Sequence, residues 1–226
     1  MKRPDFRLYL ITDKRLSPAG NIIAAIKAAL DAGCRAVALR EKDMGGGELF
    51  RLAERLKVLT SDYGARLFIN DRIDVALGVD ADGVHLGQAG FSPKDARRLL
   101  GRKKLIGVST HSVLEAIKAQ KDGADFITLG PIYPTPSKAE YGRPVGLGVL
   151  KKATGRLEIP IFAIGGVKKE RIKEVTEGGA YGVALISAII KSPDIKTVGK
   201  RTAEILKELD MITKIPLPKG EKRGIA

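Results

Sequence analysis

Residues 126–138 read Phe-Ile-Thr-Leu-Gly-Pro-Ile-Tyr-Pro-Thr-Pro-Ser-Lys, a short apolar run followed by a loop that continues to Gly146. Prolines fix φ and remove N–H donors, so the loop is neither an ordinary helix nor an inner strand. We interpret it as a long functional loop that leaves the end of a strand. Thr135, Ser137 and Lys138 offer two hydroxyls and an ammonium, which suit phosphate oxygens. The alternative is a surface turn with a solvated lysine.

The same pattern of an apolar run closed by polar residues recurs along the chain. It predicts eight strands, at residues 8–11, 36–40, 66–71, 83–88, 105–110, 126–131, 159–164 and 182–186. Helical spacing predicts helices between them, including one opened by Ser92-Pro93, one capped by Ser112 and Glu115, one over 168–177 and a last one ending near 209–212.

Strands that alternate with helices predict a parallel sheet, and eight units in this length predict a closed (β/α)₈ TIM barrel. An open doubly wound sheet is the alternative. No Gly-x-Gly-x-x-Gly follows the first strand, which counts against that alternative.

Length and composition fit one globular domain, since 226 residues with 44% hydrophobic and 29% charged residues can bury a full core. We expect the barrel over residues 1–212 and a basic, mobile tail over 213–226. The only cysteine, Cys34, cannot form an internal disulfide, and the apolar run 8–11 is too short for a signal or a membrane span. A cytoplasmic protein without membrane partners is therefore expected.

The net charge of +14 has two interpretations. Nucleic acid would suit it, but six Phe, five Tyr and no Trp leave little for base stacking, and no nucleic-acid motif is present. Steering of small phosphorylated anions explains the charge equally well. We therefore expect phosphorylated small molecules as partners, not nucleic acid, and the sequence leaves a homo-oligomer open.

Polar residues that end the strands should converge, because a barrel places its active site at the C-terminal ends of its strands. They are Arg40 and Lys42, Asn70 and Asp71, His85 and Gln88, Ser109 and His111, Thr135, Ser137 and Lys138, Gly165 and Gly166, and Ile186 and Ser187. Three cations and one carboxylate describe a polyanion site with room for a metal. Asp71 could hold Mg²⁺ against a diphosphate, or could instead cap the helix that follows it.

A second anion site is expected after the seventh and eighth strands. Gly165 and Gly166 allow backbone N–H groups to approach a phosphate, and Ser187 follows the eighth strand. The alternative for the glycines is a tight turn. His85 is expected to be a satisfied interior residue more than a catalyst, and His111 could equally lie on the surface.

These residues together resemble the thiamine phosphate synthase and TenI family over about residues 8–209. The resemblance rests on motifs in family order: Leu-Tyr-Leu-Ile-Thr-Asp at 8–13, Leu-Arg-Glu-Lys at 39–42, Asn-Asp-Arg at 70–72, Asp-Gly-Val-His-Leu-Gly-Gln at 82–88, Gly-Val-Ser-Thr-His at 107–111, Gly-Pro-Ile-Tyr-Pro-Thr at 130–135, Ala-Ile-Gly-Gly at 163–166 and Ile-Ser-Ala at 186–188. It implies a barrel enzyme, a transferase of thiamine biosynthesis, that joins a pyrimidine diphosphate to a thiazole phosphate with Mg²⁺ and releases diphosphate.

The resemblance also implies roles by position. The pyrimidine diphosphate would be held by Arg40, Glu41, Lys42, Asn70, Ser109 and Lys138, of which Arg40, Lys42, Ser109 and Lys138 are the expected catalytic residues. Asp71 would hold Mg²⁺. The thiazole phosphate would be held by Thr135, Ser137, Gly165, Gly166, Ile186 and Ser187.

Two positions depart from the synthase pattern. Ala38 stands where the family has a glutamine that contacts the pyrimidine, and Gly90 stands where it has a second Mg²⁺ carboxylate. A TenI-like thiazole tautomerase or a non-catalytic regulator that binds thiazole phosphate is therefore the alternative, although Pro131 replaces the histidine of the tautomerase. An unrelated phosphate-sugar isomerase on the same barrel is a third, more distant reading.

Overall fold

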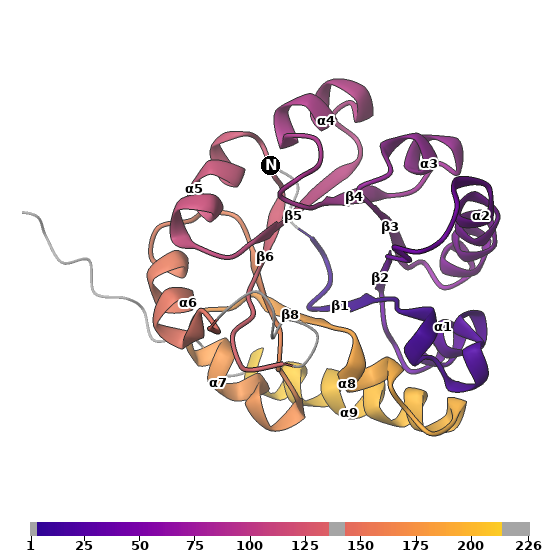
Figure 1. The fold of residues 1–226 in the computed structure, drawn as a ribbon. Coiled ribbons are helices and arrows are strands. Elements are labelled where there is room, and N and C mark those ends of the chain that lie inside the picture. The colour runs from indigo at the N-terminus through magenta and orange to yellow at the C-terminus, as the bar shows by residue number, and fades with distance from the viewer. Residues whose placement is uncertain (1–3, 136–142, 214–226) are drawn as a thin grey trace, which may run out of the picture.

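The computed structural model describes residues 4–135 and 143–213, and it is a closed barrel of parallel strands in the order β1 to β8 (Figure 1). The strands are β1 Leu8–Ile11, β2 Ala36–Leu39, β3 Arg66–Asn70, β4 Gly83–Leu86, β5 Leu105–Thr110, β6 Phe126–Leu129, β7 Ile161–Ile164 and β8 Gly182–Leu185. The prediction of a (β/α)₈ barrel is confirmed, and β1 pairs with both β2 and β8 to close it.

The helices form a ring around the strands in Figure 1. They are α1 Ile22–Asp31, α2 Gly46–Asp62, α3 Ile73–Gly78, α4 Pro93–Leu100, α5 Val113–Lys121, α6 Gly146–Thr154, α7 Ile172–Glu177, α8 Ser187–Ile190 and α9 Ile195–Thr213, with 3₁₀ turns at Lys14–Leu16, Pro18–Gly20 and Lys169–Arg171. In the described ranges, no helix is both long and apolar enough to span a membrane.

Two helices differ from the predictions. The single helix expected over 168–177 is a 3₁₀ turn followed by the short α7. Helix α8 was not predicted, because four residues are too short to show helical periodicity. Of the expected tail, the structure describes only Thr213, the last residue of α9.

Local signals explain where several helices start. The Ser92 hydroxyl accepts the N–H of Asp95, and the Ser112 hydroxyl accepts the N–H of Glu115, as the capping pattern predicts. The carboxylate of Glu115, however, accepts the N–H of His111 rather than that of the cap residue. His111 is thereby held on the surface, next to the start of α5.

The barrel encloses an aromatic core. Inward side chains of alternate strand positions form a cluster of Tyr9, Ile11, Ala36, Ala38, Phe68, Leu105, Phe126, Phe162 and Ala184, with Phe6 packed against it. Phe126 meets Tyr9 and Phe68 edge to face, with ring centroids 5.5 Å apart. The interior is therefore filled with side chains, and a ligand can bind only at the ends of the strands.

Glycines make room for these rings. A Cβ on Gly107 of β5 would lie 2.4 Å from the Phe126 ring and 2.7 Å from the His85 ring. A separate apolar layer fills the space between strands and helices. Helix α9 packs against α1 and α7 and so covers the ring where it closes.

Candidate active site

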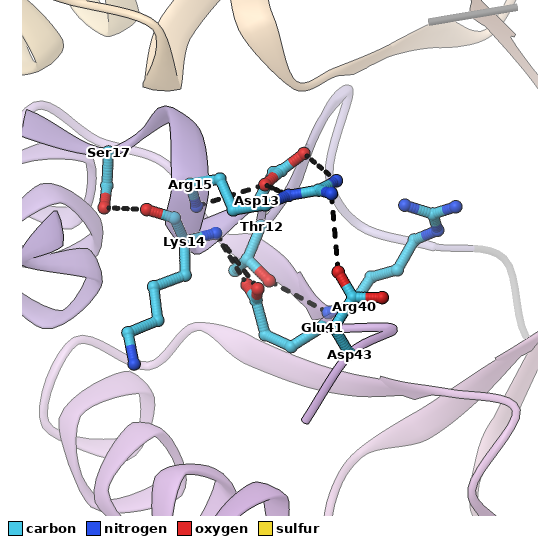
Figure 2. Close-up of polar contacts among 8 residues, drawn as sticks. All are labelled: Thr12, Asp13, Lys14, Arg15, Ser17, Arg40, Glu41 and Asp43. Carbon is cyan, nitrogen blue, oxygen red and sulfur yellow. Dashed lines mark hydrogen bonds and ion pairs between the residues drawn. The ribbon is translucent and has the colours of Figure 1, made fainter. Parts of the chain in front are cut away.

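Arg40 and Glu41 lie where β2 ends, next to the loop after β1 (Figure 2). The Thr12 hydroxyl accepts the backbone N–H of Arg40 at 2.9 Å, and the Glu41 carboxylate accepts the N–H of Lys14 at 3.0 Å. Arg15 pairs with Asp13 and with Asp43. The Thr12 and Glu41 contacts fix the backbone at the end of β2.

The Arg40 guanidinium is available for an anion. Figure 2 draws contacts to the backbone of Arg40 and none to its guanidinium, and no ion pair to it occurs within residues 4–135 and 143–213. Lys42, two residues further along the chain, is exposed. Glu41, expected to bind substrate, uses its carboxylate to tie the first two loops together.

Asp71 follows β3 and does not cap the next helix. One carboxylate oxygen accepts the N–H of Gly87 at 2.6 Å, and the other accepts the side-chain amide of Asn70 at 2.7 Å. The residue before α3 makes no side-chain capping bond. The capping alternative is therefore wrong, and Asp71 instead joins the end of β3 to the loop after β4.

The donor set for a cation is small. No group of three or more His, Cys, Asp or Glu residues suited to a metal exists in the described part of the chain. Asp71 is exposed, and a Cβ on Gly90 would lie 3.1 Å from its Oδ1. A single accessible carboxylate fits Mg²⁺ that takes most of its oxygen ligands from a bound diphosphate and water.

Ser109, near the end of β5, is fixed from two directions. His85 Nε2 lies 3.0 Å from the Ser109 hydroxyl, and the Gln88 side-chain amide donates to the Ser109 carbonyl. Burial, assisted by the charge of Arg40, lowers the pKa of His85 to about 3, so its ring is neutral. His85 lies in the interior as predicted, but it is not fully satisfied, because its Nδ1 has no hydrogen-bond partner in the described residues. Its Nε2 contacts Ser109, a predicted site residue.

Gly165 and Gly166 have positive φ values of 87° and 65°. A Cβ on Gly165 would lie 2.5 Å from Pro131, and a Cβ on Gly166 would lie 2.7 Å from both Tyr133 and the Pro134 carbonyl. Both positions therefore exclude other side chains for backbone and packing reasons. The tight turn proposed as the alternative is present, and it brings the ends of β6 and β7 together.

Arg171 braces this turn. Its guanidinium donates to the Gly166 carbonyl at 2.9 Å and lies over the Tyr133 ring, 4.1 Å from the centroid. The Tyr133 hydroxyl donates to Glu174 of α7, and the Tyr133 N–H donates to the Gly165 carbonyl. The sequence reasoning missed this brace, because it depends on which loops face each other.

The remaining predicted residues lie at the same end of the barrel. Thr135 follows β6, Ile186 follows β8 and packs against the interior cluster, and Ser187 opens α8. Ser137 and Lys138 lie outside the described residues. A pocket of about 360 Å³ between the starts of α1 and α2 contains none of the predicted site residues.

Comparisons with known proteins agree on one family. Residues 8–189 match the family model described as thiamine monophosphate synthase. A protein of Geobacter sulfurreducens named "Putative thiamine-phosphate synthase" is 52% identical over 86% of this chain and 91% of its own length. The thiamine-phosphate synthase of Methanospirillum hungatei is 42% identical over 89% of this chain and 98% of its own.

A solved structure has the same fold over most of the chain. It is titled as the thiamine phosphate pyrophosphorylase from Pyrococcus furiosus, with a TM-score of 0.82 and 36% identity. The match covers 92% of this chain and 96% of that one.

Proposed function

The chain belongs to the thiamine monophosphate synthase family, and from that premise we infer that it is a thiamine-phosphate synthase. It is a transferase that joins 4-amino-2-methyl-5-(diphosphooxymethyl)pyrimidine to thiazole phosphate and releases diphosphate. One observation carries this conclusion. Arg40 and Lys42, which form no ion pair in the described ranges, lie at the same end of the barrel as Asp71, Ser109 and the Gly165-Gly166 turn. We call this end, where the strands finish, the mouth of the barrel.

The chemistry requires charge more than a base. The C–O bond to the diphosphate breaks, the diphosphate leaves with the bonding electrons, and the thiazole nitrogen attacks the pyrimidine methylene cation. Arg40, Lys42 and Lys138 stabilise the negative charge of the leaving group. Holding both substrates in one mouth removes the entropic cost of their encounter.

The pyrimidine diphosphate is assigned to Arg40, Lys42, Asn70, Ser109 and Lys138, and Glu41 contributes by ordering the loops. The thiazole phosphate is assigned to the turn after β7 and the start of α8, with residues Thr135, Ser137, Gly165, Gly166, Ile186 and Ser187. The steric demand for glycine at 165 and 166 supports this assignment, because it leaves the turn free of side chains.

Mg²⁺ is proposed as the cofactor, with Asp71 as its protein ligand. Bound there, it supplies positive charge to the diphosphate. The two donors that orient the Asp71 carboxylate support this role, because they fix its position while leaving it exposed.

The tautomerase alternative gains no support from position 131, because a proline side chain has no group that takes or gives a proton. Turnover distinguishes a synthase from a non-catalytic regulator, because only a synthase forms product. We expect thiamine phosphate to form when the protein is given both substrates and Mg²⁺. A protein that binds either substrate but forms no product when both are supplied with Mg²⁺ would contradict the synthase and favour a regulator.

A matched pair of variants tests the cationic mouth. Arg40→Ala should lower kcat by about 10²-fold, the order seen when one transition-state charge stabiliser is removed. Arg15→Ala should retain wild-type turnover, because the Arg15 guanidinium is already paired with the carboxylates of Asp13 and Asp43. Equal losses in the two variants would contradict the assignment of Arg40.

A further inference from the structure

We propose that His85 is a positioning residue for the reaction: its neutral ring donates Nε2–H to the Ser109 hydroxyl, so that the serine directs its own O–H at the substrate. This inference rests on the proposed function, in which Ser109 contacts the pyrimidine diphosphate. The physical steps are the location of His85, its tautomer, and the hydrogen-bonding capacity that Ser109 has left.

His85 lies inside the barrel on β4, with 3% of its surface exposed. Its Nε2 is 3.0 Å from the Ser109 hydroxyl on β5 and 3.4 Å from the Thr128 hydroxyl on β6. The distance to Ser109 is that of an ordinary hydrogen bond, and the distance to Thr128 is longer. The stronger contact is therefore the one to Ser109.

The other ring nitrogen decides the tautomer. Nδ1 is buried and has no hydrogen-bond partner in the described residues. It faces Gly107, where an added Cβ would be only 2.7 Å away, and the Phe126 ring, whose centroid is 6.0 Å from that of the imidazole. Either tautomer leaves Nδ1 without a partner, but a buried N–H without an acceptor is rarer in folded proteins than a buried acceptor without a donor. The proton of the neutral ring is therefore on Nε2.

Donation from Nε2 determines what Ser109 can do. A hydroxyl has one O–H and two acceptor sites, so accepting from His85 leaves the O–H free to donate elsewhere. Gln88 holds the Ser109 carbonyl, which fixes the backbone beneath that hydroxyl. Ser109 is half-buried at the C-terminal end of β5, where substrate is expected. His85 thus sets the direction of a single donor aimed at an acceptor atom of the pyrimidine diphosphate.

Two substitutions of His85 separate donation from packing. His85→Gln keeps an N–H donor near the position of Nε2, whereas His85→Met has a similar length and no donor. We expect His85→Met to lower kcat/KM for the pyrimidine diphosphate by about tenfold, the order of one lost hydrogen bond, and His85→Gln to recover most of it.

The coupling to Ser109 is the readout that a purely structural role would not give. In a Ser109→Ala background, His85→Met should cause no further loss, because the group through which it acts is gone. An equal loss from His85→Met with and without the serine would overturn the proposal. So would a His85→Gln enzyme as impaired as His85→Met.

If the variants fail to fold, a measurement on the wild-type protein still tests the tautomer of His85. The chain has two histidines, so ¹⁵N spectra of histidine-labelled protein need one assignment variant, His111→Gln. A neutral His85 protonated on Nε2 supports the proposal, and one protonated on Nδ1 overturns it. A wild-type protein that makes no thiamine phosphate would refute the proposed function, whereas the tautomer separately decides whether His85 donates to Ser109.

Discussion

Asp71 and Gly90 set the metal requirement expected of this site. Gly90 stands where the resemblance places a second carboxylate, and a Cβ added there would lie 3.1 Å from Asp71 Oδ1. At these two positions the chain offers one carboxylate where the resemblance implies two, so a bound Mg²⁺ would take most of its ligands from the diphosphate and water. Binding to the free protein should be weak and become strong once the pyrimidine diphosphate is present.

Substitutions at these two residues should shift the Mg²⁺ dependence in opposite directions. Asp71→Asn should raise the Mg²⁺ concentration needed for half-maximal diphosphate release, and Gly90→Asp should lower it. The side chain added at position 90 requires a shift of a few tenths of an ångström from the Asp71 carboxylate. Tight Mg²⁺ binding without substrate, or an unchanged curve for Asp71→Asn, would show that another carboxylate holds the metal.

His85 should make stability depend on pH. Its pKa is about 3 in the folded protein and near 6.5 in the unfolded chain, so between these values the unfolded chain binds a proton that the folded protein does not. The free energy of unfolding should therefore fall as pH falls from 6.5, by up to about 1.4 kcal/mol per pH unit. Urea unfolding of wild type and His85→Gln measures this, since all other titrating groups cancel. Parallel pH profiles would contradict it.

The turn after β7 and the loop after β6 behave as one structural unit. Arg171 contacts the Gly166 carbonyl and the Tyr133 ring, and Tyr133 is tied in turn to Gly165 and Glu174. Both glycines of the turn have positive φ, and the contacts from Arg171 and Tyr133 reach the carbonyls of both. We infer that the brace holds in shape the turn that is proposed to bind thiazole phosphate.

Removing the brace should weaken phosphate binding without removing any ligand. Arg171→Ala should raise the KM for thiazole phosphate by about tenfold, corresponding to roughly one hydrogen bond, and leave the KM for the pyrimidine diphosphate unchanged. Lys173→Ala is the matched control, because the only ion pair of Lys173 within residues 4–135 and 143–213 is with Glu177, 3.9 Å away on the same helix. Similar KM values in both variants would show that the turn needs no brace.

The barrel as a whole depends on its aromatic interior. Phe126 contacts rings from four other segments, Phe6, Tyr9, Phe68 and Phe162, with centroids 5.4 to 6.0 Å away. The buried interior cluster takes at most two residues from any one strand, so large rings fill the centre. Closed packing here keeps the eight strand ends in place around the mouth.

Truncating the central ring should destabilise the protein strongly. Phe126→Ala should lower the free energy of unfolding by about 3–5 kcal/mol, because it leaves a cavity that the barrel cannot collapse to fill. Phe91→Ala should change it by less than about 0.5 kcal/mol, because Phe91 is 51% exposed. Chemical denaturation measures both. Equal losses would mean that the interior rearranges around the missing ring.

Much of the architecture could be predicted because it depends on local patterns. Apolar runs of four to six residues, closed by polar residues, located all eight strands, and Ser92 and Ser112 located helix starts. The glycine after α1, Gly33, adopts φ 103° as a helix stop requires. The short α8 and the divided segment before α7 could not be predicted, since neither is long enough for a periodic signal.

The sequence alone established the barrel, the set of polar residues at its mouth and the family resemblance, because alternation and motif order are properties of neighbouring residues. Contacts between distant segments required the folded chain. Asp71 turned out to bond to Gly87 instead of capping a helix, and His85 to bond to Ser109 from the next strand. Register and loop packing decide such contacts, and both follow from how eight strands close around the rings between them.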